Sequence, residues 1–98
     1  MLLVQQAQGT AITLTASDVS DPNTTSFNGD VGNWSVAGAP SAGNTYSTGA
    51  FVLRSPGNGT SYTFGGDSLS IDSGGRFLLK GTGGQVLTVN LILNGGLV

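Results

Sequence analysis

Short runs of alternating apolar and polar residues follow one another along the chain from residue 11 onward. Glycine, asparagine, aspartate, serine or proline separates most of these runs, and no window places apolar residues at the spacing of a helix. The pattern therefore predicts an all-β protein built from short strands. The expected strands are residues 11–15, 34–36, 45–48, 51–54, 61–64, 69–72, 77–80, 86–89 and 91–94.

Three consecutive strands of the second half repeat in the same order. The connections between them differ in length, which is expected if equivalent strands stack on one another while the corners bulge outward. The end of the sequence, Leu97 and Val98, then falls on Arg76 and Phe77, so that a third copy begins there. The matching segments are 49–54 with 75–80, 62–64 with 87–89, and 69–72 with 91–94.

A period of roughly 21 to 26 residues with three strands predicts a three-sided parallel β-helix, or β-solenoid. Equivalent residues should form ladders, with Phe51 over Phe77 and Ile71 over Leu93. Alternation along each strand predicts which side chains point inward. They are Phe51, Leu53, Tyr62, Phe64, Leu69, Ile71, Phe77, Leu79, Leu87, Val89, Leu91 and Leu93.

The first half of the chain lacks this repeat. We interpret residues 1–48 as an N-terminal cap with an irregular first rung, and residues 49–98 as regular rungs of which the last is incomplete. The alternative fold is an antiparallel β-sandwich, in which the glycine-rich segments 56–59, 73–75 and 82–84 are hairpin turns. The correlated repeat of three strands favours the solenoid.

Two stretches of sequence carry a resemblance to a known class of proteins. The segment FNGDVGNWS at 27–35, followed by APSAGNTY at 39–46, resembles the openings of bacterial autotransporter-like surface proteins. SLSIDSGG at 68–75 and LILNGG at 91–96 are similar to their β-strand repeats. The resemblance covers residues 26–98 and implies an extracellular or cell-surface adhesin, stalk or passenger segment. It transfers no functional residue, because the matching positions are glycines, corner residues and apolar core residues.

The composition excludes several classes of function. Only 8% of the residues are charged, three are basic, and the chain has neither histidine nor cysteine. Nucleic-acid binding needs clustered lysine and arginine, and the commonest general base and zinc ligands are missing. No apolar run is long enough to span a membrane as a helix. We therefore expect no enzyme activity, no catalytic residues, no cofactor and no metal.

The five aspartates support this expectation. Asp67 and Asp72 lie at opposite ends of one expected strand, whereas a glycosidase needs two carboxylates that face one cleft. Asp18, Asp21 and Asp30 offer oxygen ligands for Ca²⁺, but they match neither the EF-hand spacing nor the glycine-rich calcium repeat. Turn formation is the preferred role for all five.

The open C-terminal end is the first candidate surface. A solenoid that ends within a rung leaves an unpaired strand edge with exposed apolar ladders, at Leu91, Leu93, Leu97 and Val98. Such an edge stacks on the rest of a longer solenoid or on a second copy, head to tail. The expected function is therefore a non-catalytic structural or adhesive segment.

Carbohydrate binding is the alternative. Trp34 and Tyr46 flank a loop rich in glycine and alanine, and an exposed aromatic face would stack on the sugar ring of a surface glycan. Asn33 and Asn44 would then bind the hydroxyl groups. The competing interpretation is that Trp34 plugs the open top of the solenoid.

Overall fold

The computed structural model describes residues 9–19, 25–81 and 83–98. These residues contain eight short strands and no helix. Glycine, proline and asparagine interrupt the chain so often that no strand exceeds five residues. The strands are β1 (Ala11–Thr13), β2 (Thr45–Ser47), β3 (Val52–Arg54), β4 (Tyr62–Thr63), β5 (Ser68–Asp72), β6 (Arg76–Leu78), β7 (Leu87–Thr88) and β8 (Leu91–Asn94).

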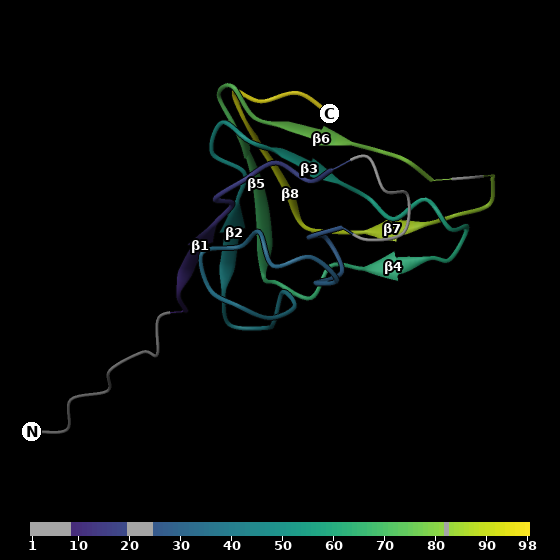
Figure 1. Cartoon of the computed structure of the whole chain (residues 1–98), viewed down its shortest axis with the longest axis horizontal. Helices are drawn as coiled ribbons and strands as arrows, with labels where there is room; N and C mark the ends of the chain where they lie inside the picture. The colour runs from purple at the N-terminus through teal and green to yellow at the C-terminus, as the bar shows by residue number, and fades with distance from the viewer. Residues whose placement is uncertain (1–8, 20–24, 82) are drawn as a thin grey trace, which may run out of the picture.

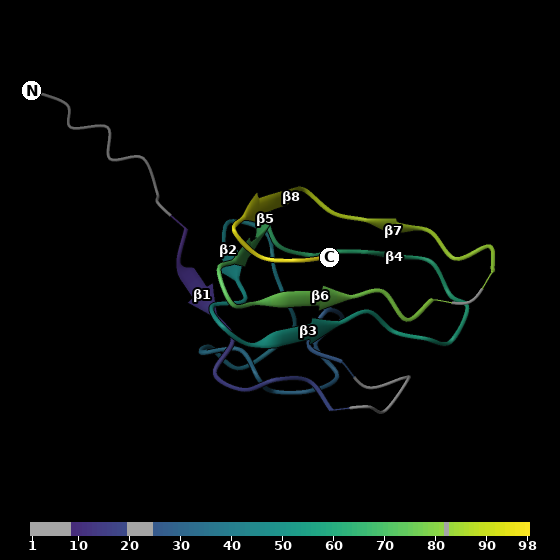
Figure 2. The same ribbon diagram turned by 90° about the horizontal axis from the view of Figure 1, so that it is seen from above.

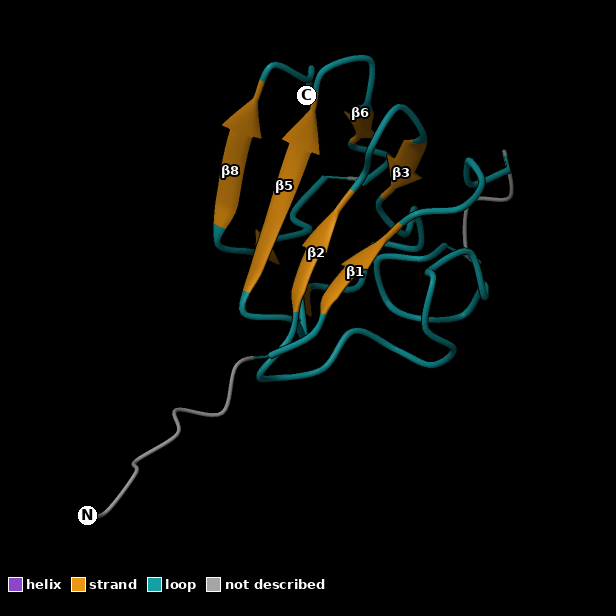
Figure 3. Cartoon of the chain, turned by 90° about the vertical axis from the view of Figure 1, so that its left-hand side faces the viewer, coloured by secondary structure: helices purple, strands orange, loops and turns teal. Residues whose placement is uncertain are grey.

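The strands form three separate parallel sheets (Figure 1). The largest has the order β1-β2-β5-β8, and its strands lie side by side and point the same way in Figure 3. The two smaller sheets pair β3 with β6 and β4 with β7. We call a set of three consecutive strands, one from each sheet, a layer. The strands β2, β3 and β4 form one layer, β5, β6 and β7 form the next, and β8 begins the last.

The predicted three-sided parallel β-helix is wrong. The sheets are short, separate and unequal, with four, two and two strands, and they do not form three continuous faces. The described part of residues 14–44 contributes no strand, so the two smaller sheets receive nothing from the first half. Glycine-rich connections also limit β4 and β7 to two residues each. An all-β description holds only in part, because turns, bends and loops make up most of the described chain.

The β-sandwich alternative is also wrong. All five strand pairs are parallel, whereas a sandwich of hairpins requires antiparallel neighbours. Antiparallel contacts in the described residues are confined to two isolated bridges, Leu14 with Trp34 and Asp72 with Gly95. The glycine-rich segments therefore turn the chain between sheets and not back along the same sheet.

The sequence repeat predicts part of the strand register. Tyr62 pairs with Leu87 and Ile71 with Leu93, as expected, and Leu97 bridges Arg76 in parallel. The prediction for β3 and β6 is wrong by two residues, because Leu53 lies beside Phe77. The residue expected there, Phe51, belongs to the preceding turn, where its N–H donates to Thr48 O at 3.1 Å.

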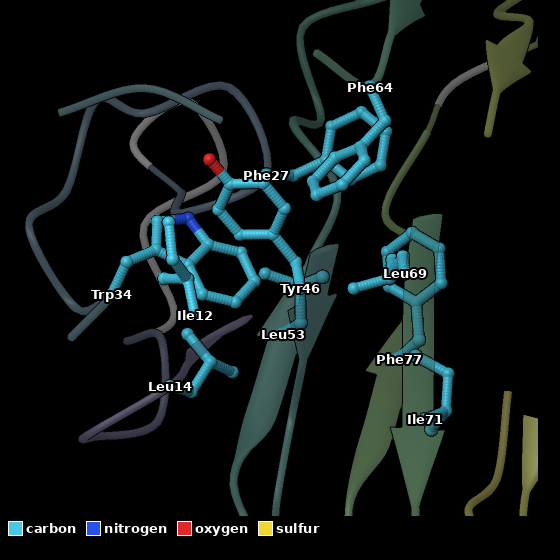
Figure 4. Packing of buried hydrophobic residues seen from close by; sticks show 10 residues of the cluster. All are labelled: Ile12, Leu14, Phe27, Trp34, Tyr46, Leu53, Phe64, Leu69, Ile71 and Phe77. Atoms are coloured by element: carbon cyan, nitrogen blue, oxygen red, sulfur yellow. The ribbon is translucent and has the colours of Figure 1, made fainter. Parts of the chain in front are cut away.

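One cluster of buried apolar residues joins both halves of the chain (Figure 4). Phe27 packs against Phe64 and Phe77, with ring centroids 5.2 and 5.6 Å apart. Burial of each large side chain contributes roughly 1.5–3 kcal/mol. The cluster consists of Ile12, Leu14, Phe27, Trp34, Tyr46, Leu53, Phe64, Leu69, Ile71 and Phe77.

Five of the predicted inward side chains are buried in this cluster, and Tyr62, Leu87 and Val89 pack partly against it. The inward prediction is wrong for Phe51 and Leu79, which are exposed. Leu91 and Leu93 are exposed as well, because no described strand covers the outer side of β8.

Gly75 lies at a close approach between two layers. It is buried, and its N–H donates to Asp72 O at 2.8 Å. A Cβ atom at this position would overlap with the carbonyl oxygen of Gly49 and with Oγ1 of Thr48 in the layer below. Since the first of these is backbone, no side-chain rotation relieves the overlap.

We expect Gly75→Ala to lower the free energy of unfolding by about 1–3 kcal/mol, the usual cost of overpacking. Gly32→Ala is the control, because a Cβ atom there meets open space. Urea unfolding, followed by the fluorescence of the one tryptophan, measures both variants. Equal stability of the two variants would contradict the close approach of the layers.

Candidate functional site

The outer edge of β1 is covered by the chain itself. Ser35 N–H donates to Thr13 O at 2.7 Å, and Thr13 N–H donates to Ser35 Oγ at 3.1 Å. Thr15 N–H then donates to Asn33 O at 2.8 Å. These bonds satisfy the outward backbone groups of Thr13 and the N–H of Thr15, which an edge strand otherwise leaves unpaired. The C-terminal half of this edge is therefore closed.

Side chains close the lower edge of β3 in the same way. Val52 N–H donates to Ser17 Oγ at 3.0 Å, and Arg54 N–H donates to Asp18 Oδ2 at 3.0 Å. Asp18 N–H in turn donates to Val52 O at 2.9 Å. Two side-chain oxygens thus take the place of the carbonyl groups that a strand below β3 would supply.

The carboxylate of Asp18 connects this edge to the cap. It also accepts from Ser26 N–H at 3.1 Å, from Ser26 Oγ at 2.5 Å and from Asn33 Nδ2 at 3.1 Å. The residue is only 7% exposed. Hydrogen bonds to a buried carboxylate contribute more than neutral ones, so Asp18 anchors residues 26–33 to the bottom of the stack.

The aspartates are not brought together as a metal site. Asp18 uses its oxygens in structural hydrogen bonds, Asp30 is exposed, and Asp21 lies outside the described residues. No cluster of three or more acidic, histidine or cysteine side chains occurs in the described parts of the chain. Asp67 and Asp72 each accept a backbone N–H at their own corner, from Gly43 at 2.9 Å and Gly49 at 3.1 Å.

The residues expected to bind a glycan belong to the cap and core. Trp34 and Tyr46 are 4% and 3% exposed, and they contact each other edge-to-face with centroids 4.9 Å apart. Trp34 Nε1–H donates to Ser26 O at 2.7 Å, and the Tyr46 hydroxyl accepts from Ser41 N–H at 2.9 Å. Neither ring presents a face on which a sugar could stack.

The two asparagines expected beside these rings also have structural partners. Asn33 donates to Asp18, whereas Asn44 lies in the loop before β2. Its Oδ1 accepts from Thr10 N–H at 3.1 Å, and its Nδ2 donates to Ser41 Oγ at 2.8 Å. Both side-chain amide nitrogens and the Oδ1 of Asn44 are therefore engaged within the chain.

The opposite end of the stack is open. All four residues of β8 are exposed, and no described strand pairs with its outer edge. Figure 2 shows β7 and β8 on one side of the molecule and the purple and blue loops of the first half on the other. The residues predicted for a stacking end, Leu91, Leu93, Leu97 and Val98, are all exposed at this end, with Leu93 and Leu97 each 62% exposed.

An apolar hollow of about 370 Å³ lies inside the open end. Part of its lining was expected in the core, but no hollow was expected, because the strands of an uncovered layer show the same alternation of apolar and polar residues as those of a covered one. Most of the lining comes from Phe77, Leu79, Leu87, Val89, Leu91 and Val98.

Gln85 adds a polar group to this hollow. Its Nε2 donates to Thr60 O at 2.6 Å and to Pro56 O at 2.9 Å, which fixes the side chain on the layer below. Its Oε1 is buried and has no hydrogen-bond partner among the described residues. A buried acceptor without a donor is costly, so Gln85 is a site of local destabilisation beside the hollow.

A second hollow, of about 390 Å³, lies between the loop of residues 27–40, here called the cap loop, and β4. Its lining includes Asn28, Asp30 and Tyr62. Its polar groups serve local turns: Asn28 Oδ1 accepts from Asp30 N–H at 3.2 Å, and the Tyr62 hydroxyl accepts from Asn58 Nδ2 at 2.7 Å. The open end remains the stronger candidate, because it combines apolar surface with an unpaired strand.

No protein-family model, curated protein or solved structure gives a significant match to the chain. The part of the chain described by the structure also contains no helix that is long and apolar enough to cross a membrane. The geometry of the two ends is therefore the basis for a functional proposal.

We expect Asp18→Asn to lower the free energy of unfolding by about 2–3 kcal/mol, since an amide group replaces an acceptor oxygen that faces hydrogen-bond donors. Asp30→Asn, which removes an exposed charge of the same sign, is the matched control. Urea unfolding measures both. If the two variants are equally stable, Asp18 does not anchor the cap.

Proposed function

We propose that the chain is a non-catalytic structural or adhesive segment of a secreted bacterial surface protein, and that it associates through its open end. The observation that carries this proposal is the difference between the two ends. Side chains of the N-terminal half bond the edges of β1 and β3 at one end of the stack, while β8 exposes both its edge and its apolar residues. An exposed apolar strand edge is a site for the addition of another strand.

The hydrogen bonds to β5 show which groups of β8 are available. Leu69 N–H donates to Asn90 O at 2.9 Å, and Leu69 and Leu91 are register partners. In a parallel pair, backbone groups point alternately to either side of the strand. The N–H and C=O groups of Leu91 and Leu93 therefore face away from β5, where a further strand would bind them.

The charge pattern also favours association. Residues 81–98 contain no aspartate, glutamate, lysine or arginine. Natural proteins commonly protect an exposed strand edge with charged side chains, lysine above all, because charge opposes the pairing of edges. The last layer has no such protection, and apolar surface buried there contributes roughly 25 cal/mol per Å².

The extracellular location rests on the resemblance of residues 26–98 to autotransporter-like repeats. Glycan binding through Trp34 and Tyr46 has no support from the geometry, because both rings are buried. The proposed surface is therefore the open end alone.

The test compares the 98-residue chain with Leu93→Asp. We expect the native chain to associate as its concentration is raised, as measured by sedimentation velocity, and we expect Leu93→Asp to remain a monomer. The substitution places a charge on the open end at a residue that is 62% exposed, so that the fold tolerates it. A native chain that stays monomeric at all concentrations would overturn the proposal.

Val36→Asp is the matched control for this experiment. It adds the same charge at a residue that is 49% exposed in the cap loop, away from β8. The control should associate as the native chain does, and urea unfolding should show that both variants are folded. Equal loss of association in both variants would indicate an effect of net charge and would count against the open end.

A further inference from the structure

The sequence of β8 and the residue before it is a palindrome. Residues 90–94 read Asn-Leu-Ile-Leu-Asn in both directions. Side chains alternate along the strand, so Leu91 and Leu93 share one face, and Ile92 shares the other with both asparagines. Each face of the strand is therefore symmetric about Ile92.

The edge of β8 has the same symmetry. The backbone groups of Leu91 and Leu93 face outward, and those of Ile92 face β5. In an antiparallel pair, two residues with outward groups lie opposite each other and exchange both hydrogen bonds. A second β8 strand satisfies this condition when Leu91 lies opposite Leu93.

We propose that the partner of the open end is a second copy of this chain, and that two copies join through their β8 strands in antiparallel orientation about a two-fold axis at Ile92. This inference rests on the association proposed above. Leu91 of one copy then pairs with Leu93 of the partner subunit. Ile92 lies opposite its own equivalent, and Asn90 lies opposite Asn94 of the partner subunit, so that like side chains meet on both faces.

The closed end of the stack argues against head-to-tail assembly. A head-to-tail contact would place β8 against β1, where the outward backbone groups of Thr13 are already bonded to Ser35. It would also meet the edge of β3, which Ser17 and Asp18 occupy. A two-fold contact uses only the open end, and the interface is then the same patch on both subunits.

The remainder of the open end fits this arrangement. Residues 81–98 carry no charged side chain, so no like-charged side chains of β8 oppose each other across the axis. The rotation brings the two apolar hollows together, so that each copy covers the other's hollow.

The test uses Ile92→Cys, because the native chain has no cysteine and any disulfide must then join two copies at this residue. Residues opposite each other without mutual hydrogen bonds have Cα atoms about 4.5 Å apart, within the range of about 4.4–6.8 Å that a disulfide bridges. We expect oxidation to convert most of the Ile92→Cys protein to a covalent dimer, measured by non-reducing electrophoresis and mass spectrometry.

Val36→Cys is the control, since Val36 and Ile92 are 49% and 47% exposed and collide with equal ease in solution. It should form far less covalent dimer under the same conditions. A mixture of Leu91→Cys and Leu93→Cys proteins should cross-link to each other more than either does to itself, which fixes the register.

Two outcomes would overturn the inference while separating it from the proposed function. If the native chain associates and Leu93→Asp abolishes association, but Ile92→Cys gives no more covalent dimer than Val36→Cys, the open end associates without the two-fold contact. If the native chain is a monomer and neither cysteine variant cross-links, both the inference and the proposed association fail.

Discussion

A stack of parallel strands leaves unpaired N–H and C=O groups at each end, and the organisation of this protein depends on how each end satisfies them. At the N-terminal end the acceptors are side chains: Ser35 bonds the edge of β1, while Ser17 and Asp18 bond the edge of β3. The same residues hold the loops that carry Phe27 and Trp34 against the core. The residues that bond the strand edges therefore also hold the hydrophobic core closed.

The aromatic residues of the first half complete a core that the repeated layers cannot close alone. Phe27 stacks on Phe77 and contacts Phe64, while Trp34 packs on Tyr46. The Trp34 indole N–H is satisfied by Ser26 O, and Ser26 is itself bound to Asp18. The short segment from Ser26 to Trp34 thus makes both polar and apolar contacts. At the other end, β8 has neither a capping loop nor a charged side chain.

The sequence repeat was sufficient to predict the three strand pairs of the second half and their parallel register at Tyr62 and Ile71. It did not predict that β1 and β2 extend the largest sheet. It could not determine the register of β3 on β6. A shift of two residues leaves the same face inward, so Phe51 and Leu53 are equally good partners for Phe77 by alternation alone. The turn at Thr48, which includes Phe51, decides between them.

The candidate site was predictable only in part. The open end follows from the unmatched last copy, and its four exposed apolar residues were identified. The role of Asp18 was not, because its partners Ser26, Asn33 and Arg54 are distant in sequence and a lone aspartate is typical of a turn. The sequence around Trp34 is compatible both with a buried plug and with an exposed sugar-binding platform. Only the packing of the side chain distinguishes the two roles.

Amide hydrogen exchange, followed by NMR at low and high protein concentration, tests the contrast between the two ends most directly. We expect slow exchange for the N–H groups of Thr13, Val52 and Arg54 at every concentration, because side-chain oxygens accept their hydrogen bonds. We expect fast exchange for Leu91 and Leu93 in dilute solution and slow exchange when the protein is concentrated. Fast exchange at Val52 and Arg54, or exchange at Leu91 and Leu93 that does not change with concentration, would contradict this contrast.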